Sequence, residues 1–143
     1  MEKTHSMTPG FPAPNVDVLS EPFWSAAQRS QLVIQQCCKC ADIHFPPAPV
    51  CPRCLAAEQR WIPASGRATL FTWGVFHKAY WDSVAELTPY LVAVVELEEG
   101  PRLMTNLVGI DTEDQLRLGM PLEVTFRQQS PDFQAPVFRP EAE

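Results

Sequence analysis

Alternating apolar and polar positions dominate the second half of the chain and predict β-strands there. Residues 66–78 (GRATLFTWGVFHK) are rich in Thr, aromatic and β-branched side chains, and residues 90–98 and 121–128 alternate along one face. Residues 102–110 add a fourth segment, and residues 136–139 can supply a fifth. The side chains expected to face inward are Leu91, Ala93, Val95, Leu97, Leu122, Val124 and Phe126, with Glu123, Thr125 and Arg127 facing outward. Short strands of this number predict a small closed barrel.

Two helical segments interrupt the β pattern. Ser20 is the predicted N-cap of a helix over residues 21–30, since proline is tolerated in a first turn and Pro22 stands there. The apolar residues near helical spacing are Phe23, Trp24, Ala27 and Leu32. Asp111 is the predicted cap of a helical turn that ends before Gly119.

The remaining segments carry too little apolar pattern to form a core of their own. The first 19 residues are rich in proline and lack periodicity, so we expect an extended arm that stays mobile or lies on a partner. Short apolar pieces among cysteines and prolines follow the helix, and a bound metal must hold them together. The expected division is an arm (1–19), a helix (20–31), a metal-held segment (32–62) and a barrel (63–140).

Composition narrows the functional classes. A length of 143 residues fits one ordinary domain or two very small ones and leaves no room for a large multidomain enzyme. Fifteen prolines argue against a helical bundle. With 17 acidic and 11 scattered basic residues, the net charge of −6 disfavours nucleic-acid binding. Neither a membrane span nor a signal-peptide core is present, so a cytoplasmic protein is expected.

The two cysteine pairs Cys37-x2-Cys40 and Cys51-x2-Cys54 are the most specific motif in the sequence. Two thiolates three positions apart can take adjacent corners of a tetrahedron, and the second pair completes a four-coordinate site. Because protein ligands would fill all four positions, we expect a structural metal, with zinc favoured and iron as its rival. Cys38 lies outside the pattern and is interpreted as a spare thiol rather than a nucleophile.

Aromatic and basic side chains cluster just after the first barrel strand. His77, Lys78, Tyr80 and Trp81 can form a lip for an adenine or acyl group. Aromatic stripes of this kind more often fill a barrel mouth or cover a subunit interface. A glycine-rich phosphate loop, a nucleophile elbow, a metalloprotease motif and paired carboxylates are all missing from the sequence, so we assign no catalytic residue.

Several short motifs follow one another in an order typical of one protein family. They are the Phe23-Trp24 helix, the two cysteine pairs, Phe45-Pro46-Pro47, Ser65-Gly66-Arg67, Pro89-Tyr90, the VVELEEGPRLMTNLVG run, Leu118-Gly119-Met120-Pro121-Leu122-Glu123-Val124 and Phe138-Arg139-Pro140. Over residues 18–140 this order resembles the domain-of-unknown-function family 35. The resemblance implies a mainly β fold with an N-terminal helix, a rubredoxin-like zinc ribbon and a C-terminal OB-fold. The chain departs from the family at Ala41 and Leu55, where glycine usually supplies a left-handed turn residue.

The resemblance also implies a role in acyl-CoA chemistry. Family members are similar to small accessory subunits of thiolase-like acyltransferases, 3-hydroxy-3-methylglutaryl-CoA synthases or steroid side-chain aldolases, in which the partner holds the reactive cysteine. The Pro-rich arm and short acidic chain look most like the small subunit of bacterial complexes that C-acetylate phloroglucinols in antibiotic biosynthesis. The leading hypothesis is a non-catalytic accessory subunit with structural zinc in a hetero-oligomer, with Phe23 and Trp24 as anchors on the partner.

Two other binding functions stay open. The OB-fold can itself bind an acyl-CoA, with His77, Lys78, Tyr80 and Trp81 around the nucleotide. Single-stranded nucleic acid, a common ligand of such folds, is the less favoured alternative because of the acidic charge. An enzyme that uses Cys38 as a nucleophile would show an activity of the isolated chain that Cys38→Ala abolishes.

Overall fold

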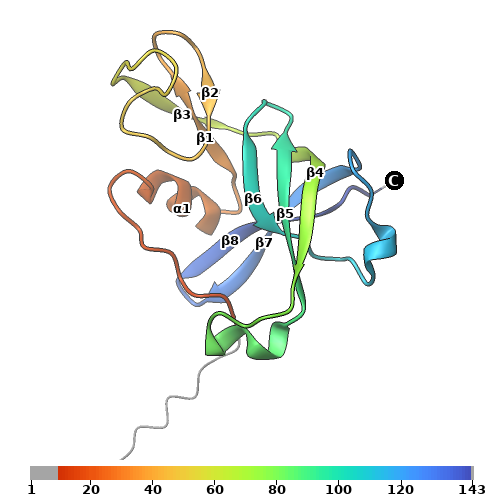
Figure 1. Cartoon of the computed structure of the whole chain (residues 1–143). Coiled ribbons are helices and arrows are strands. Elements are labelled where there is room, and N and C mark those ends of the chain that lie inside the picture. Colours follow the sequence, from red (N-terminus) through yellow and green to blue (C-terminus); the bar gives the residue numbers. More distant parts are fainter. Residues whose placement is uncertain (1–9, 143) are drawn as a thin grey trace, which may run out of the picture.

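The fold is mainly β, with one α-helix placed before two β-sheets. The computed structural model describes residues 10–142. In chain order the elements are α1 (Glu21–Gln28), β1 (Val33–Cys37), β2 (Ile43–His44), β3 (Gln59–Pro63), β4 (Arg67–Phe76), the 3-10 helix η1 (Asp82–Leu87), β5 (Tyr90–Leu97), β6 (Arg102–Asn106), the 3-10 helix η2 (Glu113–Gln115), β7 (Pro121–Ser130) and β8 (Phe133–Pro140). Figure 1 shows a small unit of α1 and β1 to β3 beside a larger one of β4 to β8.

Both sheets are antiparallel. The small sheet has the order β2-β1-β3 and the large one β6-β5-β4-β7-β8. After β6, Leu107 forms a parallel bridge with Phe138 of β8, and the Val108 N–H donates to the Phe138 carbonyl at 2.9 Å. This contact brings the two edges together, so the large sheet is a nearly closed barrel as predicted. The optional fifth strand is β8, which is longer than the predicted residues 136–139.

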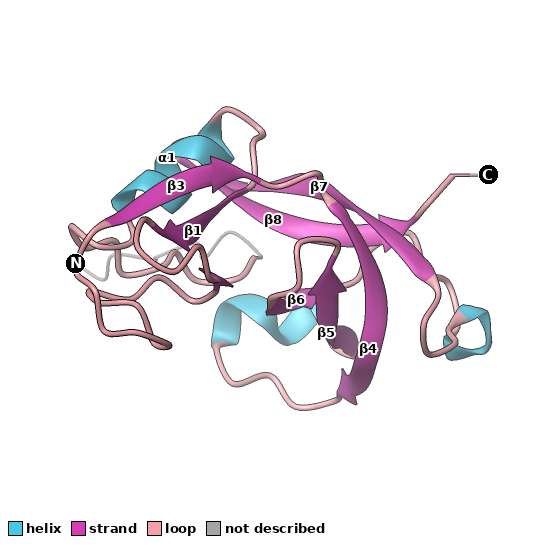
Figure 2. Cartoon of the chain, turned by 90° about the horizontal axis from the view of Figure 1, so that it is seen from above, coloured by secondary structure: helices cyan, strands magenta, loops and turns pink. Residues whose placement is uncertain are grey.

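The two units share one hydrophobic core. Phe23 of α1 and Ile34 of β1 are buried in the same cluster as Leu70, Leu122 and Phe138 of the barrel. Seen from above, α1, β1 and β3 lie together against one side of the barrel strands (Figure 2). The small unit therefore depends on the barrel for its apolar contacts. Of the residues predicted to face inward, Ala93, Val95, Leu97 and Leu122 are buried, and Leu91, Val124 and Phe126 are half-buried.

The described part of the N-terminal arm lies on the chain's own barrel. The Gly10 N–H donates to the Ser83 carbonyl in η1 at 2.8 Å. The Phe11 ring meets Tyr90 edge-on, with ring centres 5.0 Å apart, and the Arg127 guanidinium stacks on its face at 4.4 Å. Arg127, predicted to face outward, is half-buried because Phe11 covers its guanidinium. Gly10 and Phe11 of the predicted arm thus contact the chain's own barrel, while residues 1–9 lie outside the described residues.

Ser20 is the N-cap of α1 as predicted, although its hydroxyl caps none of the helix N–H groups. The Ser20 hydroxyl accepts the Asp17 N–H at 3.2 Å and the Asp17 carboxylate accepts the Ser20 N–H at 2.7 Å, so this pair closes the turn before α1 instead of capping its first residues. Donation by Ser20 lowers the pKa of the exposed Asp17 carboxyl. Thr112, not Asp111, is the N-cap of η2, and the Gln115 side chain accepts the N–H of both. Within residues 10–142, neither α1 nor either 3-10 helix is long and apolar enough for a membrane crossing.

We expect Gly66→Ala to destabilise the fold at the junction between the two units. Gly66 has a φ of +86°, and a Cβ there would lie 2.6 Å from the Val124 Cγ1 atom. Left-handed strain and overpacking together should lower the free energy of unfolding by about 2–4 kcal/mol. Gly74→Ala is the matched control, because nothing lies within 4 Å of its added Cβ. Urea unfolding curves measure both variants, and equal midpoints would contradict the close approach.

Candidate functional site

Four cysteine sulfurs converge at the end of the small sheet. Cys37 ends β1, and its sulfur lies 3.5 Å from that of Cys54; the sulfurs of Cys40 and Cys51 lie 3.6 Å apart. All four sulfurs are within 4.8 Å of one another. These distances exceed the disulfide bond length of about 2.05 Å. They match the spacing of about 3.8 Å between the corners of a tetrahedron with metal–sulfur bonds of about 2.3 Å.

Two equivalent backbone turns bring the sulfurs together. In the first, the Cys37 carbonyl accepts the Ala41 N–H at 3.1 Å and the Cys37 sulfur accepts the Lys39 N–H at 3.3 Å. In the second, the Cys51 carbonyl accepts the Leu55 N–H at 2.9 Å and the Cys51 sulfur accepts the Arg53 N–H at 3.4 Å. The same spacing of cysteines therefore gives the same turn twice, and we call these turns the two knuckles.

Each knuckle ends on a residue with a left-handed backbone. Ala41 and Leu55 both have a φ of 66°. These are the two positions where the sequence departs from the glycine of the resembled family. The left-handed conformation is kept although each residue carries a Cβ, which costs about 1–2 kcal/mol per residue.

The thiols of Cys37 and Cys40 differ in pKa. N–H donation by the Cys40 backbone lowers the pKa of the Cys37 thiol from 9.0 to about 6. For Cys40 the Asp42 backbone N–H acts in the same direction, but burial and the three neighbouring sulfurs raise its pKa to about 12. The cluster cannot hold four negative charges by itself. A divalent cation would supply the charge that keeps all four sulfurs deprotonated.

Buried polar side chains support the loop between the knuckles. The Gln35 Oε1 accepts both the Ala48 N–H, at 2.8 Å, and the His44 Nε2–H, at 3.2 Å. The Gln59 Nε2 donates to the Ala48 carbonyl at 2.6 Å. Ala48 lies between prolines, which have no N–H. The Ala48 N–H is therefore the one backbone donor at this point of the loop, and the Gln35 Oε1 is its acceptor. Sequence reasoning missed both glutamines, because glutamine is ordinarily a surface residue.

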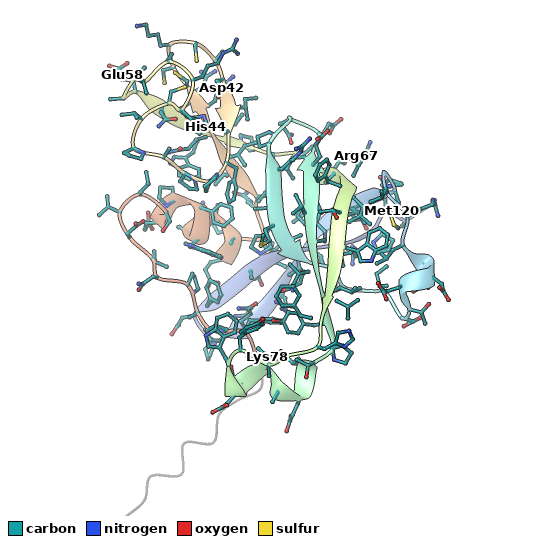
Figure 3. The ribbon with its side chains drawn as sticks, in the orientation of Figure 1. Asp42, His44, Glu58, Arg67, Lys78 and Met120 are labelled. Atoms are coloured by element: carbon teal, nitrogen blue, oxygen red, sulfur yellow. The ribbon has the colours of Figure 1, made fainter. Side chains whose placement is uncertain are left out.

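His44 lies between this network and the sulfurs. Its side chain is buried, its Nδ1 lies 3.5 Å from the Asp42 carboxylate, and the three groups Asp42, His44 and Cys51 lie within 4.8 Å of one another. Figure 3 shows Asp42 and His44 at the end of the small unit, with Glu58 close by. The pair therefore stands beside the sulfur cluster.

The donor set of the cluster fits a metal, and it leaves no position for substrate. Cys37 and Cys51 are buried, while Cys38 is exposed and its sulfur is not part of the cluster. A site with four thiolate ligands is closed, as in structural metal sites. The geometry of the sulfurs thus agrees with the structural metal site that the sequence predicts.

The structure separates the two predicted partner anchors. Phe23 is only 5% exposed and packs between Trp24 and Phe45, with ring centres 4.9 and 5.4 Å away. Its expected contact with a partner is corrected, because this ring fills the chain's own core. Trp24 is half-buried and packs on Phe133 of β8 at 4.9 Å.

The predicted aromatic and basic residues after β4 lie at the opposite end of the molecule from the sulfurs, as Lys78 and His44 show in Figure 3. His77, Lys78, Tyr80 and Trp81 are all exposed. Lys78 lies 5.2 Å above the Tyr80 ring, and Phe76 bridges Tyr80 and Tyr90. His77 instead lines a separate hollow with Ile110 to Glu113. The structure thus brings Lys78 and Tyr80 together and leaves His77 apart.

We expect one metal ion per chain, held by the four converging sulfurs. Cys51→Ser should remove it and lower the thermal unfolding midpoint by 10 °C or more, because the small unit has no core of its own. Cys38→Ser is the matched control and should keep the full metal content. Elemental analysis of the purified variants counts and identifies the metal. Metal loss in Cys38→Ser would contradict the ligand set.

Ala41→Gly and Leu55→Gly should each stabilise the metal-loaded chain. Glycine relieves left-handed strain but gains freedom in the unfolded chain, so the net increase in unfolding free energy is about 0.5–1 kcal/mol. Ala57→Gly is the control, since Ala57 is exposed in the same loop and does not have a positive φ. That variant should lose stability in the same thermal melts. Destabilisation of all three variants would contradict the strain at the knuckles.

Comparison with known proteins covers both units of the chain. Residues 24–58 match the model of the ChsH2 rubredoxin-like zinc ribbon domain, and residues 61–127 match that of the ChsH2 C-terminal OB-fold domain. The predicted zinc-ribbon and OB-fold architecture is thereby confirmed.

Three individual relatives show how far the similarity extends. A DUF35 domain-containing scaffold protein of Methanocaldococcus jannaschii is 34% identical over 102 residues, or 71% of each chain. A probable enoyl-CoA hydratase alpha subunit of Thermomonospora curvata is 40% identical over 82% of this chain, which spans only 36% of that protein. A chain of the solved Ltp2-ChsH2(DUF35) aldolase is 36% identical, with a TM-score of 0.81, and the match covers 89% of this chain and 98% of that one. By the two domain matches and the match to the scaffold protein, this chain belongs to the DUF35 family.

Proposed function

We propose that this chain is an accessory subunit of a multisubunit enzyme that processes acyl-CoA substrates. The observation that carries the proposal is the similarity, over 89% of this chain and 98% of the other, to a chain of the Ltp2-ChsH2(DUF35) aldolase, whose name joins two proteins. The words scaffold and alpha subunit in the names of two further relatives support the same role. The closed sulfur site adds physical support, because it offers structure rather than an open coordination position.

At a finer level we propose a thiolase-like acyltransferase as the partner, in a hetero-oligomer in the cytoplasm. The partner's own cysteine would carry the acyl group, and this chain would position or complete the acyl site. C-acetylation of phloroglucinols in antibiotic biosynthesis is the narrowest form of the proposal. Its support is the motif order of residues 18–140 together with the Pro-rich arm.

We propose zinc as the metal of the four-sulfur site. The ligands would be Cys37, Cys40, Cys51 and Cys54, whose spacing suits tetrahedral thiolate coordination. Zinc would neutralise the thiolates and fix the two knuckles, and it would take no part in acyl transfer. A reducing compartment keeps the cysteines free of disulfides and available to the metal.

The exposed aromatic end of the barrel is the surface we propose for partner contact. Tyr80 is 61% exposed and Trp81 is 51% exposed, and the Tyr80 ring lies 6.2 Å from the ring of the half-exposed Phe76. Large aromatic side chains dominate binding energy at protein interfaces. This surface replaces Phe23 as the anchor.

Acyl-CoA binding by the isolated chain is the second candidate function. The observation that favours it is the stack of Lys78 on Tyr80, which pairs a cation with an exposed ring as a nucleotide site does. Titration calorimetry of the isolated chain with acetyl-CoA separates the two candidates. Saturable heat would favour this alternative, and its absence would leave the accessory role.

The accessory role predicts a dependent partner. A thiolase-like protein recovered by affinity capture from the native lysate should transfer acetyl groups slowly alone and at least tenfold faster with this chain present. The double variant Tyr80→Ser and Trp81→Ser should bind that partner roughly tenfold more weakly, because it removes two aromatic contacts. Chromatography of the acetylated phloroglucinol measures transfer, and sedimentation measures binding.

Phe71→Ser provides the matched control for that experiment. Phe71 is 46% exposed, and it pairs with Arg102 rather than with the aromatic end. This variant should bind the partner as the natural chain does. A partner that is equally active without the chain would overturn the accessory role, and equal weakening by both variants would overturn the contact surface.

A further inference from the structure

Arg127 is a half-buried cation without a carboxylate partner. Its Nε and Nη2 donate to the Gln129 Oε1 at 3.2 and 2.9 Å, and its Nη2 also donates to the Asn106 Oδ1 at 3.0 Å. None of the ion pairs among residues 10–142 involves Arg127, and its Nη1 makes none of their hydrogen bonds. Burial lowers the pKa of this guanidinium. A desolvated cation held only by neutral amides is suited to an anionic ligand.

Two cavities meet at this arginine. One has a volume of about 290 Å³ and extends toward Leu87 and Tyr90. The other has a volume of about 280 Å³ and extends toward Trp24, Phe45 and Met104. The walls they share are Phe11, Asn106, Arg127 and Gln129. Together the cavities reach the size of sites that hold small organic ligands, and their walls are mainly apolar, with the guanidinium, the amides and the Thr105 hydroxyl as polar groups.

Phe11 already occupies the place between the two cavities. Its ring lies face-on to Arg127 at 4.4 Å and edge-on to Tyr90 at 5.0 Å, and its carbonyl accepts the Gln129 Nε2–H at 3.4 Å. The chain before α1 has no regular structure here, and in Figure 1 it runs beside η1 and the ends of β7 and β8. We call the space between Arg127 and Tyr90 the slot, and it holds a planar ring with a nearby carbonyl group. The segment that supplies this ring is attached through the contacts of Phe11 and the hydrogen bond from Gly10 to Ser83.

We propose that Arg127, Asn106, Gln129 and Tyr90 form a binding site for a small aromatic carboxylate, which Phe11 covers in the free chain. The ligand ring replaces the Phe11 ring between Arg127 and Tyr90. Its carboxylate accepts the N–H groups of the Arg127 Nη1. The site needs no partner subunit, so it stands independently of the proposed function.

Phenylacetate is the probe that tests this site, because it joins an aromatic ring to a carboxylate through one methylene group, a link one carbon shorter than that between the Phe11 ring and its carbonyl. Binding to the full chain is followed by amide chemical shifts in NMR titrations. Phenylacetamide lacks the charge and cyclohexylacetate lacks the aromatic ring. We expect both to bind at least fivefold more weakly than phenylacetate.

Variants of the slot sharpen the test. Phe11→Ala should bind phenylacetate at least fivefold more tightly, because the competing ring is gone, and Arg127→Gln should bind at least tenfold more weakly. Phe71→Ala and Arg102→Gln are matched controls, since Arg102 also stacks on an aromatic ring, at 3.8 Å, but is paired with Glu96. Both controls should bind phenylacetate as the natural chain does.

Three results would overturn the proposal. They are the lack of saturable shifts in both the natural chain and Phe11→Ala at 20 mM phenylacetate, equal affinity for phenylacetate and phenylacetamide, and unchanged affinity in a folded Arg127→Gln variant. If that variant unfolds, the comparison of the two probes on the natural chain decides the role of the charge. Shifts confined to residues away from the two cavities would likewise count against the site.

Discussion

The convergence of four sulfurs within 4.8 Å is the constraint on which the N-terminal half of the structure depends. A three-stranded sheet with strands of two to five residues cannot bury a core of its own. The two knuckles close it instead, and they do so at a cost, since Ala41 and Leu55 hold a left-handed backbone. The strain persists because the same residues fix where Cys37 and Cys51 point.

The shared core extends this constraint to the rest of the molecule. The sulfur cluster holds β1 in place. Ile34 of β1 and the preceding Leu32 then pack in the hydrophobic core that contains Leu70 and Phe138 of the barrel. Helix α1 is tied to the same wall, because the Gln134 side chain in β8 donates to the Ala27 carbonyl at 2.8 Å. The zinc-ribbon unit and the barrel therefore form one packed body rather than two domains on a linker.

Sequence patterns predicted the elements better than they predicted the contacts between them. Strand alternation identified β5 and β7, β-branched and aromatic composition identified β4, and cysteine spacing identified the sulfur cluster, because all three signals are local in the sequence. The burial of Arg127 depends on Phe11, a residue 116 positions away in the sequence. Alternation alone carries no information on such a contact. The same holds for Phe23, whose ring packs on Phe45 outside the helix and belongs to the core shared with the barrel.

The separation of the two ends of the chain limits what a metal can do here. The sulfurs lie at one end and the exposed aromatic residues at the other, as His44 and Lys78 mark in Figure 3. A metal site that is closed and lies at the far end cannot contact a ligand or partner bound at the aromatic end. It can affect such binding only through the hydrophobic core that joins the two units. Removing the metal would then weaken contacts at the aromatic end only as far as it loosens β1 and α1. The barrel strands β4 and β5 pair with each other over eight positions and do not depend on the ribbon for that pairing. The barrel can therefore keep its local geometry when the metal is removed. Trp24 and Phe45 belong to the small unit and line the second cavity but not the first. Metal removal would therefore change the shape of the second cavity more than that of the first.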